Sequence, residues 1–541
     1  MQRAAPRVFY SVLAAVFVVC AACSGGGNSG TEQAQQPPPQ AQQADPPATT
    51  PPPSTTPPPD PSPQPAAPPA LNPIVSENLK VGTANVLSSL IENYDSDTIA
   101  GYADATSVNL GEQIRFKVST AQPGTYAIDV YRLGYYNGLS TRHVASSGTL
   151  DGVTQSVCAV TDRATRLIEC KWNDSYALTA GADWTSGIYV AVLTHSASGA
   201  EYPVYFVVRD DARRSDIVFQ SSRATALAYS SWGNASEHYS LYAYNSTNSN
   251  AAKKVSLDRP STEQRTASNL LNFELQMLRW LESQGYDVTY ISDIDLQSSA
   301  ASLLDHKVYL SVGHDEYWSK EKRDAVEAAR DARVNLGFFS ANSVYWRVRF
   351  ESSSSGVPNR VMVCYKDSRT PDPVAPTYRW RDPPNNLPEN ALVGVMTIGN
   401  HGDVFGGFDW IVTNTNDPYF ADTGLDKAPP PRALYGYEWD GVVDNGHTPS
   451  GLVILGASPV LATSVTTGIP KNPHQIANAV RYTHASGAKV FATGSIQWMW
   501  GLDSMLINPT RVDPRVQQFA VNVLADLGAK PQTPGERIVV R

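Results

Sequence analysis

Two strand patterns flank a helix pattern in the middle of the chain, and a tyrosine follows each strand. Residues 308–312 and 335–340 are short apolar runs, and residues 320–332 between them have helical periodicity. The order strand, helix, strand is typical of parallel strands whose carboxyl ends meet at one edge of a sheet, where open α/β sheets bind ligands. We therefore expect Tyr317 and Tyr345 to lie close together at that edge.

The composition indicates a globular protein that binds no nucleic acid. The 541 residues are too many for one ordinary core, and a hydrophobic fraction of 42% with 11 Trp and 26 Tyr supplies enough apolar surface for two. The formal net charge of -9 leaves no basic surplus for contacts with phosphates.

Residues 1–23 have the features of an export signal. Arg3 and Arg7 precede an apolar run at 8–20, and two alanines stand before Cys23. The arrangement resembles a bacterial lipoprotein signal with lipidation at Cys23, although Cys20 stands where such signals usually carry Leu. We expect an exported protein in the cell envelope, anchored to the membrane through its lipid only. The alternative is ordinary cleavage, which would leave a periplasmic or secreted soluble protein.

Residues 24–75 consist mainly of Pro, Gln, Ala, Ser and Thr. Such a segment cannot form a core, and its prolines favour extended chain. We expect a disordered linker between the anchor and the folded part.

Residues 76–210 have the pattern of an antiparallel β-sandwich. Short stretches alternate apolar with polar residues and are separated by Gly and Ser turns. Export also favours a disulfide between Cys158 and Cys170, whereas Cys364 is left over and is expected to be a small buried hydrophobe. The expected strands are 113–118, 125–132, 187–194 and 202–208.

Residues 211–541 alternate strand and helix patterns, which predicts a doubly wound α/β domain with a long insertion. The fold class is therefore α+β, with a β-sandwich followed by an α/β domain. Helices are expected at 269–284 and 515–527, and further strands at 287–291 and 489–493.

The side chains that this domain offers for metal binding or catalysis are mainly oxygen donors. Beyond the export signal, the chain has no P-loop, no His-Glu-x-x-His, no Cys-x-x-Cys and no Gly-x-Ser-x-Gly motif, and the whole chain has only 9 His. Hard oxygen donors suit a hard cation, and ferric iron ionises a phenol more readily than Ca²⁺ or Mg²⁺ does. The candidate donors are Tyr317, Tyr345, Glu316, Asp315, Glu438 and Asp440.

Several motifs in a fixed order resemble the large (β) subunit of N,N-dimethylformamidase and its relatives. The resemblance spans the α/β domain and extends more weakly into the sandwich through residues 131–136. The motifs are 258–260 (Asp-Arg-Pro), 313–319 (Gly-His-Asp-Glu-Tyr-Trp-Ser), 342–347 (Asn-Ser-Val-Tyr-Trp-Arg), 437–440 (Tyr-Glu-Trp-Asp), 497–503 and 522–525.

The resemblance implies a mononuclear iron, held by two tyrosines and a glutamate, on a fold related to class I glutamine amidotransferases. Tyr317 and Tyr345 match the two tyrosines, and Glu438 matches the glutamate, although Asp440 or Glu351 would be an alternative to it. Three protein ligands leave positions open for water and a substrate carbonyl, so the implied reaction is hydrolysis of a linear amide C–N bond. In it the metal polarises the carbonyl, and water activated by the metal attacks.

Four further residues are candidates for proton transfer or for orienting the ligands. They are His314, Asp315, Glu316 and His401. For His314 and His401 the alternative is a hydrogen bond that fixes a loop.

The substrate and the partners are less constrained. The enzymes that the chain resembles act inside cells on a small amide together with a small subunit, whereas this chain carries an export signal. We therefore expect a small amide other than dimethylformamide, and homo-oligomerisation stays open. The alternative function is a surface lipoprotein that binds glycan or peptide without catalysis, using aromatic residues between 229 and 244. These are Tyr229, Trp232, Tyr239, Tyr242 and Tyr244.

Overall fold

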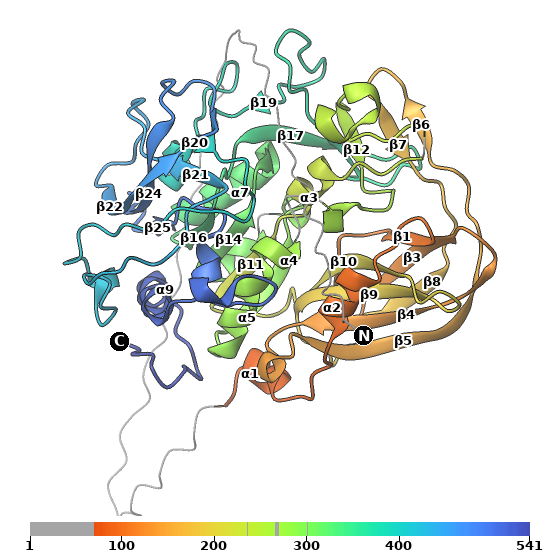
Figure 1. Ribbon diagram of the computed structural model, residues 1–541, viewed down its shortest axis with the longest axis horizontal. Coiled ribbons are helices and arrows are strands. Elements are labelled where there is room, and N and C mark those ends of the chain that lie inside the picture. The colour runs from red at the N-terminus through yellow and green to blue at the C-terminus, as the bar shows by residue number, and fades with distance from the viewer. Residues whose placement is uncertain (1–69, 235, 266–269, 300) are drawn as a thin grey trace, which may run out of the picture.

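The computed structural model describes residues 70–541 except 235, 266–269 and 300 (Figure 1). Helices and strands are mixed along the chain, which confirms the expected α+β class. Within the described residues, no helix is both long and apolar enough to cross a membrane. The expected signal, Cys23 and nearly all of the expected linker lie outside the described residues.

Nine α-helices occur in the described part of the chain, and most are short. They are α1 (Pro73–Asn78), α2 (Val86–Glu92), α3 (Arg223–Tyr229), α4 (Leu270–Phe273), α5 (Leu275–Ser283), α6 (Ala301–Leu304), α7 (Lys320–Asp331), α8 (Asn390–Val393) and α9 (Pro514–Leu527).

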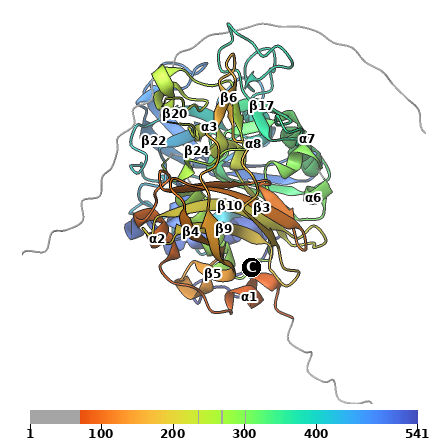
Figure 2. The same ribbon diagram turned by 90° about the vertical axis from the view of Figure 1, so that its right-hand side faces the viewer.

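Two sheets form the N-terminal part, seen edge on in Figure 2. Their strands are β1 (Ile99–Ala103), β2 (Ser107–Asn109), β3 (Gln113–Thr120), β4 (Gly124–Leu133), β5 (Thr141–Gly152), β8 (Tyr176–Thr179), β9 (Gly187–His195) and β10 (Glu201–Arg209). One sheet has the order β2-β10-β9-β4-β5 and the other β1-β3-β8, and only β2 and β10 pair in parallel. Alternating residues of both sheets share one hydrophobic cluster, in which the rings of Phe116 and Phe206 lie 5.8 Å apart.

The four strands expected in this part correspond to β3, β4, β9 and β10. Cys158 and Cys170 form a disulfide with a Cα–Cα distance of 4.4 Å. It joins the residues that flank a small hairpin of β6 (Ala159–Asp162) and β7 (Leu167–Glu169). Cys364 is a buried free thiol.

A seven-stranded sheet forms the centre of the second part. Its strands are β11 (Ile217–Ser221), β13 (Val288–Ser292), β14 (Val308–His314), β16 (Asn335–Ala341), β22 (Val453–Leu461), β24 (His474–Thr483) and β25 (Lys489–Ala492). In the order β13-β11-β14-β16-β25-β24-β22, the first five are parallel and the last two are antiparallel to their neighbours.

Helices pack on both faces of this sheet. Phe219 and Leu310 share a hydrophobic cluster with α5 and α9, whereas their neighbours Val218 and Tyr309 share another with α7. The alternation follows from the two-residue period of a strand that is buried on both sides. The strand β14, the helix α7 and the strand β16 form the strand, helix, strand unit that the sequence predicts.

Two small sheets lie next to the carboxyl edge of the central sheet. Their strands are β12 (Lys254–Ser256), β15 (Tyr317–Ser319), β17 (Trp346–Glu351), β18 (Val361–Val363), β19 (Tyr378–Arg379), β20 (Met396–Asn400), β21 (Glu438–Gly441) and β23 (Ser464–Val465). One sheet has the order β12-β18-β17-β15 with β19 beside β17, and the other has the order β21-β20-β23. These sheets occupy much of the expected insertion.

The helix expected at 269–284 is divided. Its residues form α4 and α5, and residue 269 lies outside the described residues. The interruption is at Glu274, whose buried Oε1 accepts a hydrogen bond from the backbone N–H of Ser222, 3.0 Å away. Helix α1 begins at Pro73, inside the range expected for the linker.

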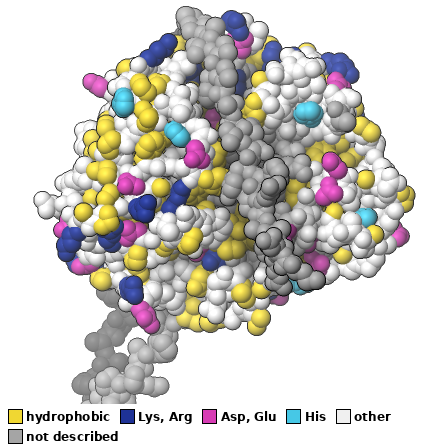
Figure 3. Space-filling model, in the orientation of Figure 1, with side chains coloured by type: hydrophobic (Ala, Val, Ile, Leu, Met, Phe, Trp, Pro, Cys, Tyr) yellow, Lys and Arg dark blue, Asp and Glu magenta, His cyan; other side chains and the backbone are white. Residues whose placement is uncertain are grey.

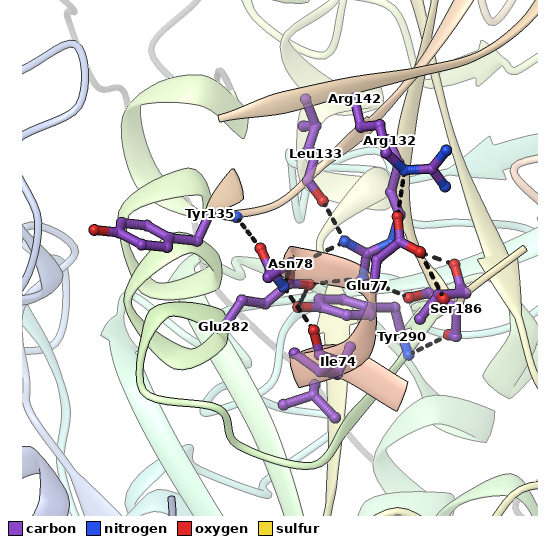
Figure 4. A network of polar contacts seen from close by, with 12 residues as sticks. Ile74, Glu77, Asn78, Arg132, Leu133, Tyr135, Arg142, Ser186, Glu282 and Tyr290 are labelled. Carbon is purple, nitrogen blue, oxygen red and sulfur yellow. Dashed lines mark hydrogen bonds and ion pairs between the residues drawn. The ribbon is translucent and has the colours of Figure 1, made fainter. Parts of the chain in front are cut away.

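A buried polar network joins the N-terminal sheets, α1 and the central sheet (Figure 4). Arg132 of β4 donates two hydrogen bonds, of 2.7 and 2.9 Å, to the carboxylate of Glu282 in α5, and neither side chain is exposed. Tyr290 of β13 donates to the same carboxylate. Glu77 of α1 accepts hydrogen bonds from Tyr136 and Arg142. The network fixes the two parts of the molecule against each other.

Acidic and basic side chains are interspersed on the face of the described residues that Figure 3 shows. Mixed surface charge of this kind keeps a protein soluble.

Candidate functional site

A polar cluster lies at the carboxyl ends of three neighbouring parallel strands. His314 ends β14, Tyr229 belongs to α3, which follows β11, and Asn342 follows β16. Gly313 makes the turn possible with φ +74°, because its missing Cβ would lie 2.5 Å from the backbone oxygen of Phe273. The site is therefore at the edge of the sheet that the sequence predicts.

Glu316 is the centre of this cluster. Its backbone N–H donates to Oγ1 of Thr225 in α3, 3.0 Å away, which fixes the loop after β14. Its side chain is buried and accepts hydrogen bonds from the hydroxyls of Tyr229, at 2.9 Å, and Tyr242, at 3.1 Å. The rings of these two tyrosines stack with centroids 4.2 Å apart. Glu316 is thus a carboxylate held by two phenols.

Tyr317 extends the cluster on one side. Its hydroxyl donates to that of Tyr242 at 2.6 Å and accepts a hydrogen bond from Nζ of Lys366 at 2.5 Å. The Lys366 ammonium lies 3.5 Å from the ring centroid of Tyr242 and 4.8 Å from that of Trp346. A cation is therefore already placed among aromatic rings next to the Tyr317 oxygen.

Glu438 extends the cluster on the other side. Its Oε2 lies 3.0 Å from Nε2 of His314 and accepts a hydrogen bond from Nδ2 of Asn342 at 2.8 Å. The same Nε2 of His314 lies 3.4 Å from Oε2 of Glu316. One buried imidazole therefore contacts two carboxylates. Asp440, two residues further along β21, accepts a hydrogen bond from the backbone N–H of Asn342.

Burial and charge shift the proton affinities in this cluster. Burial raises the pKa of Glu316, and the nearby Glu438 raises it further, against the opposing effect of His314. Burial alone would lower the pKa of His314, but the two carboxylates outweigh it and raise that pKa. Burial lowers the pKa of Lys366 to about 8. Perturbed groups of this kind cluster at functional sites.

The structure does not place the Tyr345 phenol in this cluster. The Arg381 guanidinium carbon lies 5.1 Å from the centroid of the Tyr345 ring. Burial raises the pKa of Tyr345 to about 12, against the opposing charges of Arg381 and Arg379. The backbone N–H of Tyr345 does bond the carbonyl of Glu316, so the two segments are adjacent. No hydrogen bond joins the two phenols in the described part of the chain.

Two of the proposed proton-transfer residues have other surroundings. Asp315 accepts hydrogen bonds from Lys322, at 2.6 Å, and Ser311, at 2.8 Å, which fixes it beneath the loop. His401 lies on the loop after β20, where its Nδ1 accepts a hydrogen bond from the backbone N–H of Asp403. Of the four candidates, the structure brings His314 and Glu316 into the cluster.

The donor set fits a hard cation in part. Two carboxylates and several phenols are the oxygen ligands that ferric iron prefers, and Nδ1 of the buried His314 has no hydrogen-bond partner among the described residues. Yet no three His, Cys, Asp or Glu side chains in the described ranges are arranged to hold a metal ion. A metal here would need phenol oxygens, and Tyr345 would not supply one.

Four residues of the cluster are not among the predicted site residues: Tyr229, Tyr242, Asn342 and Lys366. Tyr229 and Tyr242 were assigned to the alternative glycan-binding function, but Tyr229 is buried and both donate to Glu316. Tyr244 is 36% exposed and lies against Tyr242, so the cluster approaches solvent there. The sequence near Lys366 carries no signal that separates it from a surface lysine. These aromatics line the cluster and do not form an exposed platform for sugars.

Fold and site together define an α+β protein with a buried carboxylate, imidazole and phenol cluster at the carboxyl edge of its parallel strands. The model of the family described as N,N-dimethylformamidase beta subunit-like, C-terminal, matches residues 127–512, and the chain belongs to this family. The matched residues include the whole cluster.

The remaining comparisons carry no argument about this chain. No curated protein matches the chain. Among solved structures, a β-glucosidase from Listeria innocua is 14% identical over 20% of this chain and 16% of its own, with a TM-score of 0.13. A family 123 glycoside hydrolase from Clostridium perfringens is 9% identical over 48% of this chain and 51% of its own, also with a TM-score of 0.13. The chain thus spans about half or less of these proteins, and the similarity supports no conclusion about fold or function.

Proposed function

We propose that this protein hydrolyses linear amide C–N bonds at the cluster of His314, Glu316, Tyr317 and Glu438. The observation that carries the proposal is the contact of one buried imidazole with two carboxylates, inside the segment that matches the dimethylformamidase-like family. Amide hydrolysis needs a group that takes a proton from water and one that gives a proton to the leaving amine. Glu316 and His314 are adjacent groups able to do both.

The proposed reaction assigns a role to each residue. Water adds to the carbonyl carbon while Glu316 takes its proton, the C–N bond breaks, and His314 protonates the departing nitrogen. Tyr229 and Tyr242 hold the Glu316 carboxylate in place, and Asn342 orients Glu438. Burial keeps bulk water away and strengthens these interactions.

Mononuclear ferric iron is part of this proposal. Tyr317 and Glu438 are the residues of the expected ligand set that belong to the cluster, and Tyr242 is the phenol next to Tyr317. Bound iron would supply a Lewis acid for the amide carbonyl. The relation to class I glutamine amidotransferases remains an expectation that the resemblance supplies.

The test is amine release from a panel of short linear amides. We expect Glu316→Gln to lower kcat/KM by about 10²-fold or more, because the variant cannot accept a proton. Glu351→Gln is the matched control, since Glu351 is half-buried and pairs with Lys254 and Arg349 outside the cluster. Absence of amine release across the panel, or equal rates for both variants, would contradict the proposal. If the purified protein contained no iron and could not be reconstituted with it, iron would have no part in the proposed reaction.

We also propose that the protein is exported and lipid-anchored at Cys23, which rests on the sequence of residues 1–23. Mass spectrometry of the mature N-terminus tests this. A diacylated Cys23 is the expected result, and an unmodified N-terminus at another residue would contradict it.

A further inference from the structure

A cavity lies between the N-terminal sheets and α3, on the far side of this helix from the cluster. It has a volume of about 80 Å³ and is lined by β1, β10, α3 and the segment 257–264. On α3, residues 223, 226 and 227 line the cavity, whereas Thr225 and Tyr229 contact Glu316. The cavity and the candidate reaction centre are therefore separate sites on opposite faces of one helix.

Arg259, in the wall of this cavity, is a buried cation without an anionic partner. It is 3% exposed, and its Nη atoms donate only to the backbone carbonyls of Trp232, Tyr239 and Ser230. Among the described residues, its Nε has no hydrogen-bond partner and no carboxylate forms an ion pair with the guanidinium. Burial lowers the pKa of Arg259 to about 9, and no nearby acid opposes the effect. A buried guanidinium of this kind is costly unless an anion pairs with it.

The other charges on the wall do not compensate Arg259. Arg360 pairs with Asp258 at 2.8 Å. Arg223 pairs with Glu263, and its Nη1 still has no hydrogen-bond partner in the part of the chain that the structure describes. The cavity thus has two unsatisfied guanidinium N–H groups on its wall and one uncompensated positive charge.

We propose that this cavity binds a small monocarboxylate. A planar carboxylate matches the donor geometry of guanidinium groups, and water would satisfy the N–H groups without neutralising the charge. A volume of about 80 Å³ holds a few water-sized groups, which suits an anion with two or three carbons and excludes larger ligands. The proposal does not depend on the reaction at Glu316.

The experiment is calorimetric titration of the full-length protein with sodium acetate, with sodium chloride at equal ionic strength as the reference. We expect saturable binding with a Kd on the order of 1 mM, as two charge-assisted hydrogen bonds allow. Arg259→Gln should weaken it at least tenfold by removing the charge. Ala105 also lines the cavity, and Ala105→Leu fills it without removing a polar group, so it should weaken binding to the same extent in a protein that keeps Arg259.

Arg163→Gln is the matched control, because Arg163 is 77% exposed and pairs with Glu237 on the surface. It should bind acetate like the wild type. If the titration with sodium acetate gave the same heat as the titration with sodium chloride, the proposal would be overturned. Binding that neither Arg259→Gln nor Ala105→Leu weakens would also overturn it, since the acetate would then be an adventitious ion only.

Discussion

Tyr317 and Tyr345 stand at corresponding places in two neighbouring segments, but their phenols lie in different surroundings. Strands β15 and β17 are parallel, with Tyr317 opposite Trp346. Lys366 contacts the rings of both Tyr317 and Trp346, whereas the ring of Tyr345, which precedes β17, contacts Arg381.

This difference gives a prediction for iron binding. Tyr317→Phe should abolish iron content and any visible tyrosinate absorption band, because it removes an oxygen from the cluster. Tyr345→Phe should retain most of the iron, because its oxygen faces the arginines. Metal analysis and absorption spectra of both variants check this. Equal loss of iron in the two would contradict the different surroundings of the two tyrosines.

At the scale of elements, the position of His314 at the end of β14 depends on the glycine that precedes it. Gly313 has φ +74°, and a Cβ there would meet the backbone of Phe273 at 2.5 Å. The nearest atoms are the backbone O and C and the Cβ of Phe273, and none of them is the far end of a flexible side chain. Either β14 or α4 would therefore have to shift. The geometry of the cluster thus depends on this close approach of α4.

Gly313→Ala should destabilise the protein more than Gly111→Ala does. Gly111 has φ +82° and nothing within 4 Å of its Cβ position, so its variant bears only the backbone strain of about 1–2 kcal/mol. Gly313→Ala should cost about 1–3 kcal/mol in addition, as overpacking does. Urea unfolding of both variants measures the difference. If both variants lost the same free energy of unfolding, α4 would have moved away from residue 313 without an energetic cost.

At the scale of the whole molecule, the network of Figure 4 links parts that fold from distant stretches of sequence. Arg132 and Glu282 are both fully buried, so removing either one leaves an uncompensated charge. Glu77 brings α1 into the same network through Tyr136 and Arg142.

Acid stability should depend on Glu77. Burial alone would raise the pKa of Glu77, but the charge of Arg132 and hydrogen bonds from Lys80, Tyr136 and Arg142 lower it to about 2 from 4.5. A depressed carboxyl pKa stabilises the fold above the unfolded-state value and loses this contribution as pH falls through the folded-state value. Glu77 should contribute on the order of 2 kcal/mol to the free energy of unfolding at pH 7. This is less than the full effect of the lowered pKa, because Lys80 is partly exposed and solvent screens its charge.

Glu77→Gln should therefore be less stable than the wild type at pH 7, with the difference shrinking between about pH 4.5 and pH 2. Urea unfolding across this range measures it, with the exposed Glu92→Gln as the control. A difference that stays constant with pH would show that Glu77 acts by packing and not by charge.

The sequence by itself determined the elements around the site. The periodicity of residues 308–340 predicted β14, α7 and β16, because strands and helices bury their faces at different periods. The order of strand and helix also placed His314 and Glu316 at the carboxyl edge of the sheet. Motif spacing was enough to identify the family that residues 127–512 match.

Only the tertiary structure decided which side chains meet. Tyr229, Tyr242 and Lys366 reach Glu316 and Tyr317 from segments distant in sequence, and no local pattern records such contacts. The Tyr345 ring contacts Arg381, which comes from a segment distant in sequence, so its surroundings also depend on how separate segments pack. Local periodicity follows from the chain alone, whereas the site depends on how separate elements pack.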